Sequence, residues 1–251
     1  MQKVTLLAKI YSKAQMRKAE RILRSLLQGL KVESKVLEDA YDGWMHIELS
    51  GEDENVALKL LAEEFGLCPT SLEGVERFST MKGYLTTLEK GRDEIFVDIG
   101  VISPNSVYAA VPLRHLQAQL VDGRNLAMEK IVELFGFCEN LPLTIKVIGI
   151  DRERNRVEAA MSERQLNQYR SWQNSLLDRL IILGASAYEV SSTLKNTGLN
   201  RDVISVETLG MFEHALVCKL GTDAAGLIPR IGKILHNSNF TVFNPKKLWN
   251  L

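Results

Sequence analysis

The sequence predicts an α+β protein in which a small closed β-barrel lies between two α/β modules. Five short β-type runs occupy the middle of the chain, at 83–88, 95–100, 107–113, 143–151 and 156–162. Gly, Asn and Asp residues separate these runs, as the tight connections of a small barrel require. Helix-type and strand-type patterns are mixed on both sides of this segment. In a chain of 251 residues we therefore expect three domains, at 1–80, 81–163 and 164–251.

The N-terminal domain is expected to alternate between strands and helices. Strands are predicted at 4–11, 32–37 and 44–49, and helices at 13–30 and 52–65. Ser50 has the residue type and the position of an N-cap for the second helix. Residues 69–80 are predicted as a last edge strand or as the linker into the barrel. The resulting βαββα order is typical of a small sandwich of ferredoxin-like type.

The C-terminal domain is expected to begin with a helix over 165–183, which Gly184 terminates. Strands are then predicted at 188–193, 203–208, 215–220 and 240–243, with a helix at 227–235. This order predicts a second small α/β module, again of ferredoxin-like type. The barrel between the two modules carries an insertion at 114–140, in which residues 126–135 have helical periodicity and are expected to close one mouth of the barrel.

Composition and charge are those of an ordinary globular protein, and they exclude several classes. The chain is 45% hydrophobic and 25% charged, with 31 basic against 31 acidic residues. This balance argues against a strong, nonspecific polyanion binder, so any nucleic-acid contact must use local patches. No apolar run approaches the roughly 18 residues of a membrane span, and the N-terminus lacks a signal peptide's apolar core. The three cysteines, Cys68, Cys138 and Cys218, predict a reducing cytoplasm rather than a disulfide framework.

Three aromatic residues, Tyr84, Phe96 and Tyr108, fall on the first three predicted strands of the barrel. Barrels of OB type bind single strands by stacking bases on aromatic rings, each base contributing about 1–3 kcal/mol. The alternative is that these rings pack inside the barrel or against its helical insertion. Both interpretations stay open on the sequence alone.

The middle segment resembles the S1-type OB fold of RNA-binding proteins. A strand led by Gly83 is followed by the run Phe96-Val97-Asp98-Ile99-Gly100, a Val-x-x-Ile-Asp turn ends at Asp151, and the last strand ends at Ser162. The chain departs from the family pattern where a Gly-aromatic-aliphatic-His run is usual, because it has Ala109-Ala110-Val111-Pro112 there. The resemblance implies an RNA-binding barrel, and the departure implies a weakened base-stacking face or a barrel kept for protein contact.

Four basic residues, Lys13, Arg17, Arg21 and Arg24, recur at spacings of four, four and three in the first predicted helix. This spacing places them on one face of the helix. Cations repeated along a rigid helix can contact the phosphates of an RNA backbone. The alternative is an ordinary solvated helix face, on which Glu20 neutralises part of the charge.

The segment 216–235 is typical of a strand, a turn and a helix, and it is a second candidate for a binding site. Gly221, Thr222, Asp223 and Gly226 belong to the turn region, and Arg230 follows on the helix. Backbone N–H groups at such a helix start can bind an anion. The Asp-x-x-Gly-Leu turn is similar to that of ACT-type amino-acid-binding modules, and a small acidic metabolite is the corresponding ligand. The alternative is a tight turn that only the fold requires.

Signals for catalysis and metal binding are weak. The four histidines are scattered, and none lies at metal-ligand spacing from another His or Cys. No nucleophile elbow, dinucleotide fingerprint or zinc pair is present. We therefore expect a protein without catalytic residues, metal ions or cofactors.

The whole chain resembles an uncharacterised archaeal protein family of the same length and layout, through the S1-type middle, the α/β flanks and the run 216–235. A looser likeness is to the alpha subunit of archaeal translation initiation factor two, which joins an S1-type barrel, a helical segment and a C-terminal α/β module. These resemblances imply an archaeal, cytoplasmic protein.

The leading hypothesis is a non-enzymatic factor of the translation or transcription machinery that binds RNA or a ribonucleoprotein. Its candidate partners are components of the ribosome or of RNA polymerase. One alternative is a ligand-sensing regulator with a small acidic metabolite at the C-terminal turn. The other is a protein-interaction scaffold whose barrel has lost affinity for nucleic acid. The oligomeric state is left open.

Overall fold

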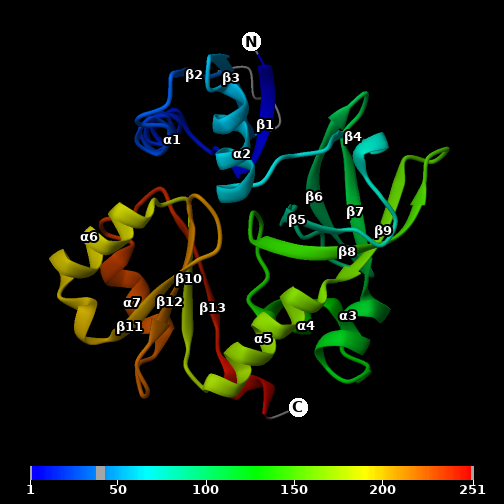
Figure 1. Cartoon of the computed structure of the whole chain (residues 1–251). Helices are drawn as coiled ribbons and strands as arrows, with labels where there is room; N and C mark the ends of the chain where they lie inside the picture. The colour runs from blue at the N-terminus through cyan, green and yellow to red at the C-terminus, as the bar shows by residue number, and fades with distance from the viewer. Residues whose placement is uncertain (1, 38–42, 250–251) are drawn as a thin grey trace.

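The computed structural model describes residues 2–37 and 43–249, which form three β-sheet units with helices packed on them (Figure 1). The N-terminal sheet contains β1 (Gln2–Lys9), β3 (Trp44–Gly51) and β2 (Val32–Val36) in this spatial order, with antiparallel neighbours. Helices α1 (Lys13–Leu26) and α2 (Glu54–Glu64) pack on one face of this sheet. Alternation along β1 and β3 directs Leu6, Met45, Ile47 and Leu49 toward these helices.

The start of α2 differs from the prediction. The strand β3 continues to Gly51, so Ser50 lies in the strand and Asp53 takes the N-cap position. Gly51 has a φ of +144°, and a Cβ there would lie 2.3 Å from the Lys31 carbonyl oxygen, so this turn requires glycine. After α2 the chain forms β4 (Thr70–Ser71), which pairs in parallel with a barrel strand. Residues 69–80 are therefore the linker into the barrel and not a fourth strand of the N-terminal sheet.

The middle unit is a closed five-strand barrel, consistent with the OB-like barrel that the sequence predicts. Its strands are β5 (Thr80–Leu85), β6 (Glu94–Ser103), β7 (Val107–Pro112), β8 (Pro142–Asp151) and β9 (Arg156–Met161). They pair in the order β6-β5-β8-β9-β7, and β7 pairs with β6 to close the barrel. Alternate residues point inward, among them Val97, Ile99, Ile145, Val147 and Val157. The insertion forms α3 (Leu113–Leu120) and α4 (Met128–Phe135), whereas the sequence predicts a single helix.

The C-terminal unit is a four-stranded antiparallel sheet. Its strand order is β11 (Val203–Thr208), β12 (Glu213–Cys218), β10 (Arg179–Leu183) and β13 (Asn239–Phe243). Helices α6 (Ala187–Thr197) and α7 (Ala224–Ile231) cover one face. The other face packs on α4 and α5 (Glu163–Ser175) through a cluster formed by Phe135, Phe137, Tyr169, Trp172 and Phe243. Single 3₁₀ turns lie at Leu72–Gly74, Leu199–Arg201 and Pro245–Leu248.

Both flanking units are thus antiparallel sheets with their own helices on one face, and their ferredoxin-like character stays a prediction. Two element predictions in the C-terminal domain are wrong. The helix expected over 165–183 ends at Ser175, and Arg179–Leu183 form β10, because this apolar run is buried throughout and has no helical period. Gly184 accordingly follows a strand and does not terminate a helix. The strand expected over 188–193 lies in α6, which begins with a capping box of Ser186 and Glu189.

Side-chain contacts hold the three units together. Phe212, from the loop between β11 and β12, is fully buried in the core of the N-terminal unit. Trp44 of β3 meets Tyr84 of β5 edge to face, with the ring centroids 5.5 Å apart. Lys9 of β1 forms an ion pair with Asp98 of β6 at 2.5 Å. Within the described residues, no helix is long and apolar enough to cross a membrane.

Candidate functional site

The three units meet at the loop between β11 and β12, residues 209–212, and at the residue that follows it. Glu213, the first residue of β12, is fully buried there. Its carboxyl group accepts hydrogen bonds from the Tyr11 hydroxyl at 3.2 Å, from the Tyr84 hydroxyl at 3.4 Å and from the Phe212 N–H at 3.3 Å. Each unit thus supplies one donor, so the cluster fixes the positions of the units relative to one another.

Burial sets the ionisation of this cluster. It raises the pKa of Glu213 to about 7, and hydrogen bonds together with the nearby Lys82 ammonium oppose that rise only in part. Burial also lowers the pKa of Lys82, whose Nζ donates to the Leu209 carbonyl oxygen at 2.6 Å. A Cβ at Gly210 would lie 2.1 Å from a Glu213 carboxyl oxygen, so a larger residue there would displace the carboxyl group. The carboxyl group is enclosed, which suits a structural role better than contact with a substrate.

A cleft of about 760 Å³ opens beside this loop, between the N-terminal and C-terminal units. Its charged lining residues are the cations Lys18, Arg21, Lys82 and Arg164 and the carboxylate Glu64. Lys18 is paired with Glu189 of α6, whereas Arg21 and Arg164 form no ion pair within the described ranges. The volume is that of a ligand site, and the excess of positive charge favours an anion. Tyr188, at the start of α6, also lines the cleft and is 81% exposed.

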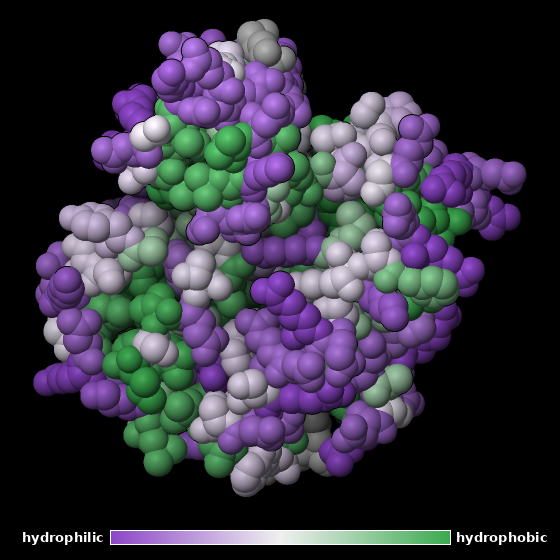
Figure 2. Space-filling model, viewed as in Figure 1, coloured by the Kyte–Doolittle hydropathy of each residue, from purple (hydrophilic) through white to green (hydrophobic). Residues whose placement is uncertain are grey.

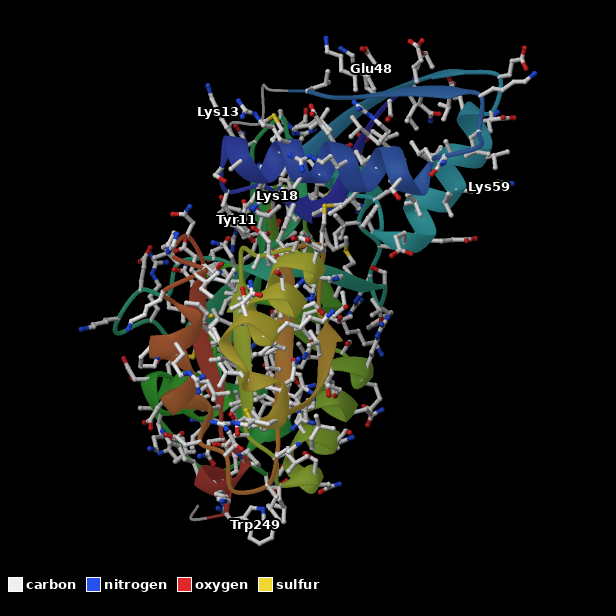
Figure 3. The ribbon with its side chains drawn as sticks, turned by 90° about the vertical axis from the view of Figure 1, so that its left-hand side faces the viewer. Tyr11, Lys13, Lys18, Glu48, Lys59 and Trp249 are labelled. Carbon is white, nitrogen blue, oxygen red and sulfur yellow. The ribbon has the colours of Figure 1, made fainter. Side chains whose placement is uncertain are left out.

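The basic residues of α1 lie on the surface, as the sequence predicts. Four of them are exposed and form no ion pair with another described residue: Lys13, Arg17, Arg21 and Arg24. Figure 3 shows Tyr11 and Lys18 on the side of α1 that faces the C-terminal unit. Arg21 belongs both to this stripe and to the lining of the cleft, so the two are continuous. We call the four α1 cations and the cleft cations the basic surface.

Hydropathy separates this region from its surroundings. Hydrophobic residues gather over α1 and α2, whereas the surface over α5 is mainly hydrophilic (Figure 2). Ile22, Leu26 and Phe65 supply apolar lining on the α1 and α2 side of the cleft, and Arg164 lies across from them on α5. The cleft therefore offers both apolar and cationic lining residues to one ligand.

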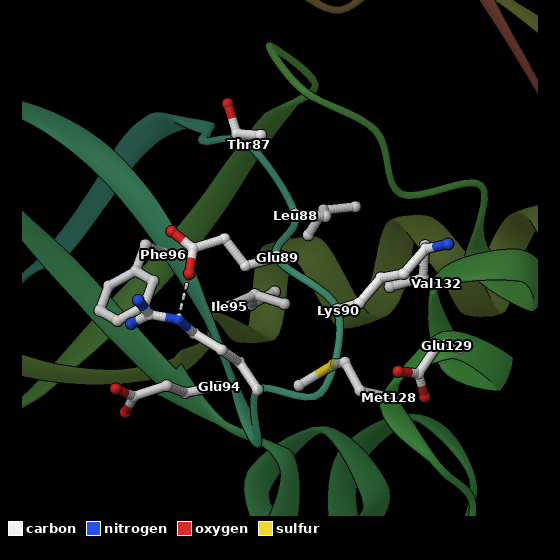
Figure 4. Close-up of a pocket in the computed structure, with 11 residues that line it drawn as sticks. Thr87, Leu88, Glu89, Lys90, Glu94, Ile95, Phe96, Met128, Glu129 and Val132 are labelled. Atoms are coloured by element: carbon white, nitrogen blue, oxygen red, sulfur yellow. Dashed lines mark hydrogen bonds and ion pairs between the residues drawn. The ribbon is translucent and has the colours of Figure 1, made fainter.

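The other two predicted aromatic residues lie on the outside of β6 and β7. Phe96 is opposite Ala110 in the strand register and Tyr108 is opposite Asp98, so both rings point away from the barrel interior. Tyr108 is 43% exposed, whereas Phe96 is half-buried, with the Arg92 guanidinium 5.7 Å from its ring centroid. Phe96 also lines a mainly apolar cavity of about 230 Å³ between the β5–β6 loop and α4 (Figure 4).

Charges on this part of the barrel are paired. The pairs are Arg92–Glu89 at 2.5 Å, Arg156–Glu94 at 2.8 Å and Arg114–Glu158 at 2.5 Å. We call these residues, with Phe96 and Tyr108, the outer barrel surface. Each of these carboxylates offsets an arginine that would otherwise attract phosphate, so these three arginines contribute little free positive charge beside the aromatic rings.

Tyr84 does not belong to the outer barrel surface. It is 1% exposed, and its hydroxyl reaches the Leu7 carbonyl oxygen at 3.4 Å as well as Glu213. The N-terminal unit covers the side of β5 on which Tyr84 lies, so the ring packs between units and cannot stack on a base. This placement corrects the prediction that Tyr84 contacts nucleic acid.

The predicted anion site at the start of α7 is already occupied by carboxylates. Gly221, with a φ of +87°, and Thr222 form the turn, and Asp223 caps α7 by accepting from a backbone N–H of its first turn at 3.1 Å. Asp178 accepts from another N–H of the same turn at 3.5 Å. Two carboxylates at one helix start disfavour an acidic metabolite, so the geometry supports the tight-turn alternative.

The remaining residues of that predicted site, Gly226 and Arg230, have structural roles. Gly226 lies within the first turn of α7. The Arg230 guanidinium donates to the Thr197 carbonyl oxygen at the end of α6. Arg230 therefore ties α7 to α6 and does not reach the turn.

Sequence reasoning missed Lys82, Arg164, Tyr188 and Glu213. Glu213 carries one usable signal, because it is an acidic residue at the start of the otherwise apolar run 213–218. The other three lie on separate elements, and no spacing pattern connects them. In residues 2–37 and 43–249, His, Cys, Asp and Glu side chains form no group of three that could hold a metal ion.

The sequence matches three family models in order along the chain. Residues 3–71 match the DUF2110 N-terminal domain, residues 75–173 the DUF2110 central domain, and residues 177–243 the DUF2110 C-terminal domain. A comparison with curated proteins gives no match.

Three solved structures each resemble part of the chain. The uncharacterised protein MJ1198 from Methanocaldococcus jannaschii is 16% identical, with 36% of this chain and 95% of that chain covered and a TM-score of 0.25. GSP13 from Bacillus subtilis is 15% identical, with 36% and 58% covered and a TM-score of 0.27. A chain of the a/eIF2alpha–aDim2p–rRNA complex from Pyrococcus horikoshii is 8% identical, with 50% and 62% covered and a TM-score of 0.27.

This chain thus spans less than two thirds of the second and third of these structures. Their low TM-scores carry no conclusion about its function. The three family models, in contrast, follow one another over most of the sequence. The chain therefore belongs to the DUF2110 family.

Proposed function

We propose that this protein is a non-enzymatic RNA-binding factor and that its RNA lies along the basic surface. The observation that carries the proposal is the set of cations on α1 and in the cleft that, Lys18 apart, form no ion pair among the described residues, in a chain whose net charge is zero. Phosphate contacts dominate the affinity of most nucleic-acid-binding proteins, and they require positive charge that is not already neutralised. Arg17, Arg21 and Arg24 provide this positive charge along one face of α1.

A single-stranded ligand fits this surface best. The exposed ring of Tyr188 stands beside cations, and stacking on an aromatic ring requires a base that is free of a partner strand. The rigid helix α1 fixes the spacing of the phosphate contacts. RNA is proposed over DNA because the barrel segment resembles the S1-type OB fold. Membership of the archaeal translation or transcription machinery, a cytoplasmic location and ribonucleoprotein partners stay predictions.

The non-enzymatic character of the proposal rests on the enclosure of Glu213. Its pKa of about 7 would suit a general base. However, Tyr11, Tyr84 and the close approach of Gly210 surround the carboxyl group. The outer barrel surface favours a second, protein-binding role, because it combines the exposed Tyr108 with charges that are already paired.

The experiment compares two triple variants that each remove three arginines. One is Arg17→Gln/Arg21→Gln/Arg24→Gln on α1, and the matched control is Arg92→Gln/Arg114→Gln/Arg156→Gln on the barrel. Fluorescence anisotropy measures binding of a single-stranded RNA of about 12 nucleotides, with a DNA of the same sequence in parallel. Affinity is recorded between about 50 and 200 mM salt.

A plot of log affinity against log salt has a negative slope. We expect the α1 variant to make this slope shallower by about 2, because each of three single-strand phosphate contacts contributes about 0.7. The barrel variant should leave the slope unchanged. A wild-type protein that fails to bind RNA at the lowest salt would refute the proposal. If only the barrel variant loses RNA affinity, the RNA binds on the outer barrel surface instead.

A further inference from the structure

A second cavity, of about 510 Å³, adjoins the cleft at its inner end. It lies between the barrel strands β5 and β8, the helix α5 and the end of β11. Lys82, Arg164 and Thr208 line both cavities, so a ligand in the cleft can extend into this space. We call it the polar arm.

The lining of the polar arm is mainly polar, and none of its described residues is acidic. Its polar side chains are Thr80, Lys82, Thr144, Arg164, Gln165, Gln168 and Thr208. The Gln165 side chain is already hydrogen-bonded within the protein. Its Oε1 accepts from the Thr144 N–H at 2.8 Å and its Nε2 donates to Gln168 at 3.1 Å. That second bond uses the Gln168 Oε1, and it leaves the Gln168 amide nitrogen to donate. The arm therefore presents two cations, hydroxyl groups and an amide donor.

The two cations of the arm line the same cavity and influence one another electrostatically. Burial lowers the pKa of Lys82, the nearby Glu213 opposes this, and the positive charge of Arg164 lowers it further. Glu213 is enclosed beneath the loop and does not line the arm. Arg164 forms no ion pair in the described part of the chain. An anion that entered the arm would relieve the repulsion between Lys82 and Arg164.

We propose that the polar arm is a phosphate-group site in which Lys82 and Arg164 are the cationic contacts and Gln168 and Thr208 supply neutral donors. A phosphate offers several acceptor oxygens around one centre, which matches donors that converge from α5, β5 and β11. The phosphate has two sources: the end of an RNA that occupies the cleft, which rests on the proposed function, or a free mononucleotide.

The experiment titrates inorganic phosphate, uridine 5′-monophosphate and uridine into the whole protein and follows the melting temperature. A ligand that binds only the folded state raises the melting temperature in a saturable way. We expect both phosphate compounds to do so and uridine to have no effect. Arg164→Gln should weaken both on the order of tenfold, because it removes a charge-assisted hydrogen bond.

Arg170→Gln is the matched control, because Arg170 lies on the same helix but pairs with Glu163 and is absent from the arm. Thr208→Val tests the site without a change in charge and should also weaken the phosphate response. A response to phosphate that is absent, or equal in wild type, Arg164→Gln and Thr208→Val, overturns the proposal.

Two RNAs that differ only in a 5′-phosphate distinguish the sources. Tighter binding of the phosphorylated RNA, lost in Arg164→Gln, assigns the site to an RNA end. Equal binding of both RNAs, with a saturable nucleotide response, assigns it to a free nucleotide. If RNA binding depends on α1 and no phosphate compound binds, the arm proposal fails while the proposed function stands. If phosphate compounds bind and RNA does not, the proposed function fails while the polar arm remains a phosphate site for a free nucleotide.

Discussion

The outer barrel surface and the basic surface both place aromatic rings beside cations, yet their charges are arranged in opposite ways. Three arginines of the barrel pair with glutamates at 2.5–2.8 Å. Arg17, Arg21 and Arg24 of α1 have no such partner within residues 2–37 and 43–249. A chain of zero net charge can therefore attract a polyanion, if pairing neutralises the cations of one surface and leaves those of another free.

This difference shows why an exposed aromatic ring is a poor marker of a nucleic-acid site by itself. Tyr108 is 43% exposed and Tyr188 is 81% exposed, so exposure alone makes both candidates. A stacked base contributes about 1–3 kcal/mol, which is too little to hold a strand whose phosphates meet a neutral surface. Tyr188 shares a cavity with Arg21 and Arg164, which form no ion pair among the described residues.

The largest expected effect concerns Tyr84 and Tyr108, which the sequence assigns to the same role. Tyr84→Ala removes a buried ring between two units and should lower the free energy of unfolding by about 3–5 kcal/mol. Tyr108→Ala should lower it by less than Tyr84→Ala, because Tyr108 is 43% exposed. Urea denaturation followed by circular dichroism measures both. Equal stabilities of the two variants would contradict the placement of Tyr84 between the units.

The second effect concerns the pH dependence of the junction. The Glu213 carboxyl group binds its proton more tightly in the folded protein, with a pKa of about 7 against an ordinary value of 4.5 for a solvated glutamate. Its contribution to stability is therefore fully present below about pH 4.5 and is lost as the pH rises toward 7. This loss is on the order of 3 kcal/mol.

Glu213→Gln cannot ionise and should abolish that loss. The stability of the variant relative to wild type should therefore rise between about pH 4.5 and pH 7.5. Glu158→Gln, on the outer barrel surface, is the matched control and should show no comparable change. Chemical denaturation at several pH values provides the measurement, and a relative stability of Glu213→Gln that is flat with pH would show that the carboxyl group is not enclosed.

Much of the fold could be predicted because its signals are local. The five β-type runs and the turn residues between them locate the barrel. The strand Arg179–Leu183 defeats the same reasoning, because residues 180–183 are buried on both faces and form a continuous apolar run without a period. The start of α6 resembles a strand in sequence, because Tyr188 and Val190 are residue types common in strands. The capping box of Ser186 and Glu189 that begins the helix is a weaker signal in the sequence.

The candidate site was predictable only where it lies on one element. Lys13, Arg17, Arg21 and Arg24 share a helix face, which their spacing alone determines. The cleft is different, because Arg21, Lys82 and Arg164 meet only through the packing of three units. The misplacement of Tyr84 has the same cause, since alternation tells which side of β5 a residue occupies but not what covers that side.

The smallest expected effect is the most direct comparison of the two surfaces. Tyr188→Ala should weaken binding of single-stranded RNA by about 1–3 kcal/mol, because one base loses its stacking partner beside the α1 cations. Tyr188→Phe should retain the affinity, because the ring stacks without its hydroxyl, and an exposed residue of α6 should not alter the fold. Tyr108→Ala should leave the affinity unchanged, because the charges around it are paired. Anisotropy titrations of the three variants at one low salt concentration test this. A larger loss from Tyr108→Ala than from Tyr188→Ala would reverse the comparison, since stacking would then be strong enough to hold RNA on a surface without free positive charge.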